Sequence, residues 1–90
     1  MPMNYFLDLV ITTSASKKIK KMDRETKSRI QDTIEKLRTI PPQGDIKSLK
    51  GYSNIKRCRA GKWRIIFEQN IGKLELIIYK IDSRGQIYKK

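Results

Sequence analysis

The chain has 90 residues, 38% of them hydrophobic and 33% charged, and its formal net charge is +12. This length supports one domain with a modest core and excludes a second domain or a deep cofactor cavity. The charge is uneven, because residues 46–90 hold 12 Lys and Arg against 3 Asp and Glu, a net +9, whereas residues 1–45 have a net +3. We therefore predict that the second half binds a polyanionic partner.

Several residue types that carry chemistry are scarce or missing. The chain has no histidine and only one cysteine, Cys58, so it lacks the usual general base, the commonest metal ligand and any internal disulfide. We expect no cofactor and no metal site, and we interpret Cys58 as a small core residue. There is no signal-peptide pattern and no apolar run long enough to span a bilayer, so we expect a cytoplasmic protein without a membrane partner.

The first half predicts one strand followed by two helices. Residues 5–11 are aromatic and β-branched, which is typical of a strand. Thr13 or Ser14 offers an N-cap for a first helix, and Asp23 offers one for a second helix over about residues 24–39, which two prolines end.

Each predicted helix has an apolar face with residues at i, i+4 and i+7. These residues are Ala15, Ile19 and Met22 on the first helix and Ile30, Ile34 and Leu37 on the second. Lysines such as Lys17 cover the opposite side of the first helix. We interpret that basic side as solvated, with a supplementary contact to phosphates as the alternative.

The second half predicts a loop and then a run of strands. Residues 41–54 contain Pro, Gly and Ser and are expected to form a loop, followed by strands at about 55–60, 62–69 and 73–81. The last strand is almost continuously apolar, which favours a central strand covered on both faces, and residues 82–85 are expected to turn. The predicted fold class is α+β, in the order β-αα-βββ(β), with a helical hairpin on one face of a small, twisted, mainly antiparallel sheet.

Three arginines fall on alternating positions of two of these strands. Arg57 and Arg59 must share one face of their strand, and Arg64 can join them across a turn at Gly61 and Lys62. Three guanidinium groups would repel one another, so such a patch makes sense beside a nucleic acid backbone or an acidic protein.

The strand that follows the turn has one apolar face. Trp63, Ile65 and Phe67 alternate on that face, which we expect to pack on the helices, while Arg64 and Ile66 share the other. Trp63 is therefore interpreted as a core residue, with a base-stacking platform as the alternative. The side of the sheet without helices is predicted to be the cationic one.

Together these residues resemble a known family. The order of elements, with Leu49–Gly51, the run from Arg57 to Phe67 and the segment Ile81–Lys89, is similar to the RelE/ParE superfamily of bacterial toxins. The members are the toxin halves of type II toxin–antitoxin pairs, and an antitoxin with an extended segment neutralises them. RelE-like members cleave mRNA in the ribosomal A site, whereas ParE-like members inhibit DNA gyrase.

The resemblance to the RelE branch also implies roles for individual residues. Arg57, Arg64 and Arg84 match catalytic basic positions, and Tyr88 is the candidate for proton transfer, with Lys50 as the alternative. Arg59 matches a further basic position of the family, and we expect it to bind RNA together with Lys50, Lys62 and Lys80 of the basic second half.

Two positions depart from the RelE pattern. Ile55 stands where RelE-type enzymes carry a further lysine, and Ser83 stands where many relatives have a histidine. The favoured interpretation is a metal-independent, ribosome-dependent endoribonuclease that binds mRNA and a cognate antitoxin and forms a toxin–antitoxin hetero-oligomer. The alternatives are a ParE-like gyrase inhibitor that acts by binding and a non-enzymatic basic RNA-binding module.

Overall fold

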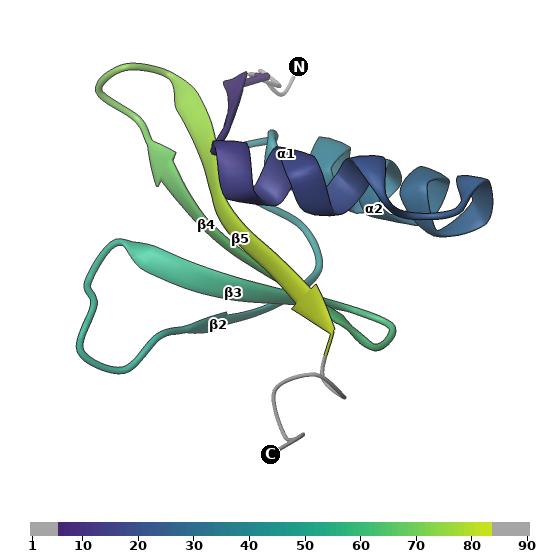
Figure 1. Cartoon of the computed structure of the whole chain (residues 1–90). Helices are drawn as coiled ribbons and strands as arrows, with labels where there is room; N and C mark the ends of the chain where they lie inside the picture. The colour runs from purple at the N-terminus through teal and green to yellow at the C-terminus, as the bar shows by residue number, and fades with distance from the viewer. Residues whose placement is uncertain (1–5, 84–90) are drawn as a thin grey trace.

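Two helices cover one face of a five-stranded sheet in the computed structural model, which describes residues 6–83 (Figure 1). In chain order the elements are β1 (Asp8–Ile11), α1 (Thr13–Lys20), α2 (Arg24–Leu37), β2 (Asp45–Ser48), β3 (Ile55–Ala60), β4 (Trp63–Asn70) and β5 (Glu75–Ser83). The strand order is β1-β5-β4-β3-β2. Only β1 and β5 are parallel among these neighbours, so the predicted α+β fold with a mainly antiparallel sheet is confirmed.

The helices begin at side-chain caps and are tied to the sheet. Asp23 caps α2 as predicted, by accepting a hydrogen bond from the Thr26 amide at 2.9 Å. The α1 cap is Thr12, one residue before the prediction, and its hydroxyl also donates to the Tyr79 carbonyl on β5. Within residues 6–83, neither helix combines the length and the apolar character that a membrane crossing requires.

α2 ends at Leu37, two residues before the predicted end. The Gln69 amide on β4 donates to the Leu37 and Thr39 carbonyls, both at 2.8 Å. A side chain distant in sequence thus satisfies carbonyls that the helix end leaves free, which local sequence could not reveal.

The core lies between the helices and the sheet. Phe67 and Ile65 of β4 are almost fully buried, and half-buried Trp63 packs against the same core, as predicted. The other buried residues are Leu7, Ala15, Ile30, Ile34, Leu37, Cys58, Leu76, Ile78 and Ile81.

Three predictions about the sheet were wrong. Residues 45–48, which were expected in a loop, form β2, because they pair with β3 and place Ile46 against the core. β5 continues through Asp82 and Ser83, which were expected in a turn, because both residues pair with β4. β5 is central, but the helices cover only one of its faces, and Lys80 on the other face is exposed.

A β-bulge changes which β5 residues face the helices. Ile66 pairs with Lys80 and Phe67 pairs with Ile78, so Tyr79 is left without a partner on β4. The extra residue reverses the alternation beyond it. Ile81 therefore faces the core like Ile78, and Lys80 and Asp82 face the side without helices.

Candidate nucleic-acid interface

The side of the sheet away from α1 and α2, here called the open face, carries the three arginines. Arg57 and Arg59 flank Cys58, which is buried under the helices, and Arg64 precedes the buried Ile65. Arg59 and Arg64 are direct partners across β3 and β4. The predicted clustering of these arginines on one face is confirmed.

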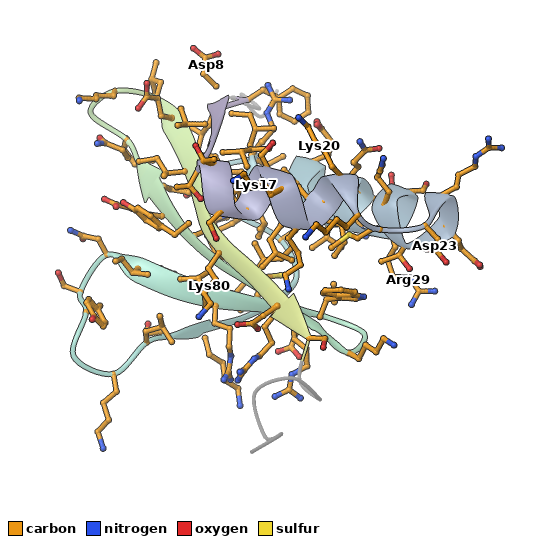
Figure 2. All side chains as sticks on the ribbon, in the orientation of Figure 1. Asp8, Lys17, Lys20, Asp23, Arg29 and Lys80 are labelled. Atoms are coloured by element: carbon orange, nitrogen blue, oxygen red, sulfur yellow. The ribbon has the colours of Figure 1, made fainter. Side chains whose placement is uncertain are left out.

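Two lysines extend this group across the sheet. Lys47 of β2 is the partner of Arg57, and Lys80 of β5 is the partner of Ile66. Figure 2 shows Lys80 over the sheet, apart from Lys17 and Lys20 on α1. The cationic cluster is Lys47, Arg57, Arg59, Arg64 and Lys80. Lys47 was missed as a member because its segment was expected in a loop, although its alternation with Ile46 was a usable signal.

An aspartate lies within the cationic cluster. The Asp82 carboxylate is 3.7 Å from Nε of Arg64 through Oδ1 and 3.8 Å from Nζ of Lys80 through Oδ2. Its side chain is 15% exposed. Asp82 Oδ1 and Arg64 Nε are both buried and neither makes a hydrogen bond. Asp82 is a member of the site that the sequence pattern did not indicate, because residues 82–85 were expected to form a turn.

The register places two aspartates symmetrically about the arginine pair. Asp45 of β2 is the partner of Arg59, and Asp82 of β5 is the partner of Arg64. A row of four charged residues therefore crosses β2, β3, β4 and β5, with acidic side chains at the ends and arginines in the middle. The two ends differ, because Asp45 is exposed whereas Asp82 is mostly buried.

The centre of the open face is hollowed. A hollow of about 330 Å³ is lined by Leu49, Arg57, Arg64, Ile66, Lys80 and Asp82. This volume is at the small end of the range for ligand sites. The floor of the hollow is apolar, and three cationic side chains and one carboxylate surround it. The cations can bind a phosphate group, and the carboxylate places a proton-accepting oxygen beside it.

Two other titratable groups near the sheet are unsuited to accept a proton. The Tyr79 hydroxyl donates to Glu68 Oε1 at 2.6 Å, and this hydrogen bond raises the pKa of Tyr79, with a smaller effect of burial. Burial raises the pKa of the Cys58 thiol, which faces the helices. Both groups therefore keep their protons at neutral pH.

The remaining predicted site residues lie apart from the hollow or outside the described residues. Lys50 is exposed in the loop between β2 and β3, next to Leu49. Lys62 is exposed in the turn between β3 and β4 and does not line the hollow. Its charge adds a small effect to the Thr26 hydrogen bonds that lower the pKa of Asp23 at the start of α2. Arg84 and Tyr88 lie beyond residue 83, outside the described part of the chain.

The described residues offer no ready metal site. Within residues 6–83, no three His, Cys, Asp or Glu side chains gather closely enough to hold a metal ion.

The fold of two helices on one face of an open sheet is similar to that of solved toxin structures. The fold matches a chain of the RelB–RelE antitoxin–toxin complex from Methanococcus jannaschii, with TM-score 0.70 and 27% identity over 89% of this chain and 95% of that one. It matches the archaeal RelE–RelB complex from Pyrococcus horikoshii, with TM-score 0.74 and 22% identity over 93% and 99%. It also matches the isolated E. coli RelE toxin, with TM-score 0.70 and 15% identity over 86% and 83%. These likenesses define the class of protein as one with the RelE-like toxin fold.

The sequence gives the particular family within that class. A family model for the ParE toxin of type II toxin–antitoxin systems, parDE, matches residues 9–88. The chain belongs to this family of the RelE/ParE superfamily and is a toxin of a type II toxin–antitoxin system. No curated protein matches its sequence. The resemblance inferred from the sequence motifs is thereby confirmed.

Proposed function

We propose that this toxin is a ribosome-dependent endoribonuclease that binds mRNA on its open face and cleaves it without a metal ion. The observation that carries the proposal is the hollow in which Arg57, Arg64 and Lys80 converge. Guanidinium and ammonium groups are the side chains that bind phosphate most strongly. The likeness to the RelE chain from Methanococcus jannaschii, at 27% identity, supports the same branch.

The cations fit the needs of RNA cleavage by the internal 2′-hydroxyl. In that reaction the 2′-oxygen attacks the neighbouring phosphorus, and negative charge develops on the phosphorane oxygens. Arg57 and Arg64 would stabilise this charge, each contributing on the order of 2–4 kcal/mol by analogy with oxyanion-hole donors. Arg59 and Lys47 would hold the adjoining backbone, while Arg84 and Tyr88 keep the roles that the resemblance implies, at the scissile phosphate and in proton transfer.

The shape of the site favours dependence on the ribosome. The cationic cluster lies on an exposed sheet face, and a small hollow cannot by itself fix a flexible RNA in the geometry of in-line attack. Holding reactants in the reactive geometry contributes much of the rate enhancement in catalysis. We propose that the ribosome supplies this alignment and that the toxin supplies the charges.

A cognate antitoxin is the second proposed partner. Two of the solved relatives are antitoxin–toxin complexes, which supports a toxin–antitoxin hetero-oligomer here. An acidic antitoxin segment over the open face would compete with RNA for the cationic cluster.

The test is mRNA cleavage on programmed ribosomes. Arg64→Ala should slow cleavage on the order of 10²–10³-fold, because it removes a phosphate-stabilising cation, and Arg84→Ala should do the same. Lys17→Ala on α1 is the control and should retain the wild-type rate. Thermal melting in parallel separates lost chemistry from lost folding. Full activity of both arginine variants would refute the assignment.

The family match favours a second candidate, a DNA gyrase inhibitor that acts by binding. On this alternative the purified toxin would leave mRNA on ribosomes intact and would block supercoiling by gyrase. In growing cells, a rapid loss of protein synthesis supports the endoribonuclease, whereas filamentation with DNA damage supports the gyrase inhibitor.

A further inference from the structure

Asp82 is an acidic residue in a surface that otherwise favours anions. It lines the hollow together with Arg57, Arg64 and Lys80. We propose that Asp82 is the general base that takes the proton of the attacking 2′-hydroxyl, an inference that rests on the proposed endoribonuclease function.

The two carboxylate oxygens of Asp82 have different surroundings. Oδ1 is buried 3.7 Å from Arg64 Nε, too far for a hydrogen bond, and neither atom has another hydrogen-bond partner. Oδ2 is on the side of Lys80, at 3.8 Å from Nζ. Arg64 therefore anchors one oxygen by charge, and the other is the oxygen that a substrate in the hollow would reach. A buried, unpaired polar atom in a native structure calls for an explanation, and a catalytic role is one of the recognised ones.

Other candidates for the base on the open face are weaker. Arginine stays protonated and cannot accept a proton. Glu68 accepts the Tyr79 hydroxyl, and neither of these residues lines the hollow. Asp45 is exposed at the opposite end of the charged row and does not line the hollow. Among the described residues that line the hollow, Lys80 is the remaining alternative, and the pH dependence described below distinguishes it from Asp82.

The step balances without a further reactant except water. Asp82 takes the 2′-hydroxyl proton while the 2′-oxygen forms a bond to phosphorus and the bond from phosphorus to the 5′-oxygen breaks. The leaving 5′-oxygen takes a proton from water, and protonated Asp82 then returns its proton to water. The products are a 2′,3′-cyclic phosphate and a 5′-hydroxyl end. Arg64 and Lys80 contact the non-bridging phosphate oxygens during the step.

The experiment is single-turnover cleavage of mRNA on programmed ribosomes by the full chain. Asp82→Asn keeps the size and polarity of the side chain, so cleavage should slow on the order of 10²–10⁴-fold, the usual contribution of a general base. RNA affinity should be unchanged or tighter, because a negative charge leaves the cationic cluster. Asp45→Asn is the matched control, since it removes an aspartate that also pairs with an arginine in the same charged row. It should retain the wild-type rate.

The pH profile gives a readout that a positioning role would not change. If the base is a carboxylate, the wild-type rate should be flat from neutral to alkaline pH, whereas a lysine base would make it rise. The Asp82→Asn rate should rise about tenfold per pH unit as hydroxide replaces the missing base.

Several results would overturn the inference. One is a wild-type rate for Asp82→Asn. Another is an Asp82→Asn variant that binds RNA more weakly but has the same pH profile as the wild type. That result would make Asp82 only a positioning residue for Arg64. A wild-type rate that rises toward pH 10 would assign the base to a lysine or a tyrosine instead of Asp82, and this measurement uses the wild-type protein alone. Failure of the wild type to cleave would refute the proposed function itself, which distinguishes the two failures.

Discussion

Arg59 and Arg64 are direct partners across β3 and β4, and each has an aspartate as its partner on the outer side, Asp45 and Asp82 respectively. Like charges at directly opposite positions in a sheet destabilise it, and opposite charges at the next positions offset the effect. In this row of four charged residues, the two outer aspartates therefore allow the two arginines to lie side by side in the free protein. A bound phosphate would interact with both.

Arg59→Gln should weaken binding to a single-stranded RNA oligonucleotide and reduce its salt dependence. If Arg59 neutralises one phosphate, the slope of log affinity against log salt should become shallower by about 0.7, the value per contact for single strands. Fluorescence anisotropy over a series of NaCl concentrations measures this slope. Lys17→Gln on α1 should leave it unchanged, and an unaltered slope for Arg59→Gln would remove Arg59 from the RNA interface.

The antitoxin complex should be only partly sensitive to salt. Phe6 is 61% exposed, and Leu9 and Val10 on β1 are also exposed, so the toxin offers apolar as well as cationic surface. Apolar burial is not screened by ions, whereas exposed charge pairs are. Calorimetric titration with the antitoxin should give weaker but measurable binding at about 0.5 M NaCl, where the Debye length is only a few ångströms. Complete loss of binding there would indicate an essentially electrostatic complex.

Phe67→Ala should lower the free energy of unfolding by about 3–5 kcal/mol, because it leaves a cavity at the centre of the core. Phe67 is 1% exposed and is among the largest fully buried side chains. Urea denaturation followed by circular dichroism measures the change. Ile71→Ala is the control, since Ile71 is 50% exposed, and it should shift stability by less than about 0.5 kcal/mol.

Asp23 should contribute a pH-dependent part of the stability. Hydrogen bonds from Thr26 hold the pKa of the Asp23 carboxyl below its usual range, with a smaller effect from the charge of Lys62. A depressed folded-state pKa means that the stabilisation is fully present above the unfolded-state pKa and is lost as pH falls through the folded-state value. The melting temperature of the wild type should therefore fall more between about pH 5 and pH 2 than that of Asp23→Asn, which keeps an N-cap without the charge. Equal falls would show that Asp23 is uncoupled from folding.

Patterns within single elements could be predicted well from the sequence. The spacing of Ile30, Ile34 and Leu37 indicated the buried face of α2, and the alternation around Cys58 indicated the face of Arg57 and Arg59. Side-chain direction follows from helical and strand periodicity alone, so residue order suffices for these predictions. The motifs built on the same residues were also enough to suggest the superfamily.

Relations between elements depended on the tertiary structure. β2 exists because β3 offers it a pairing edge, and its own composition is that of a loop. The bulge that leaves Tyr79 unpaired turns Lys80 and Asp82 to the open face, although an uninterrupted alternation from Ile78 would have placed Ile81 there. Strand register and bulges arise from contacts between distant segments, which local periodicity does not encode.

The sequence by itself thus determined the helices, most of the strands, the buried faces and the cationic character of the second half. Only the tertiary structure added Lys47 to the cationic cluster, placed Asp82 between Arg64 and Lys80, and left Lys62 away from the hollow. The physical reason is that charge and hydrophobicity belong to single residues, whereas a binding site depends on the register with which distant strands pair.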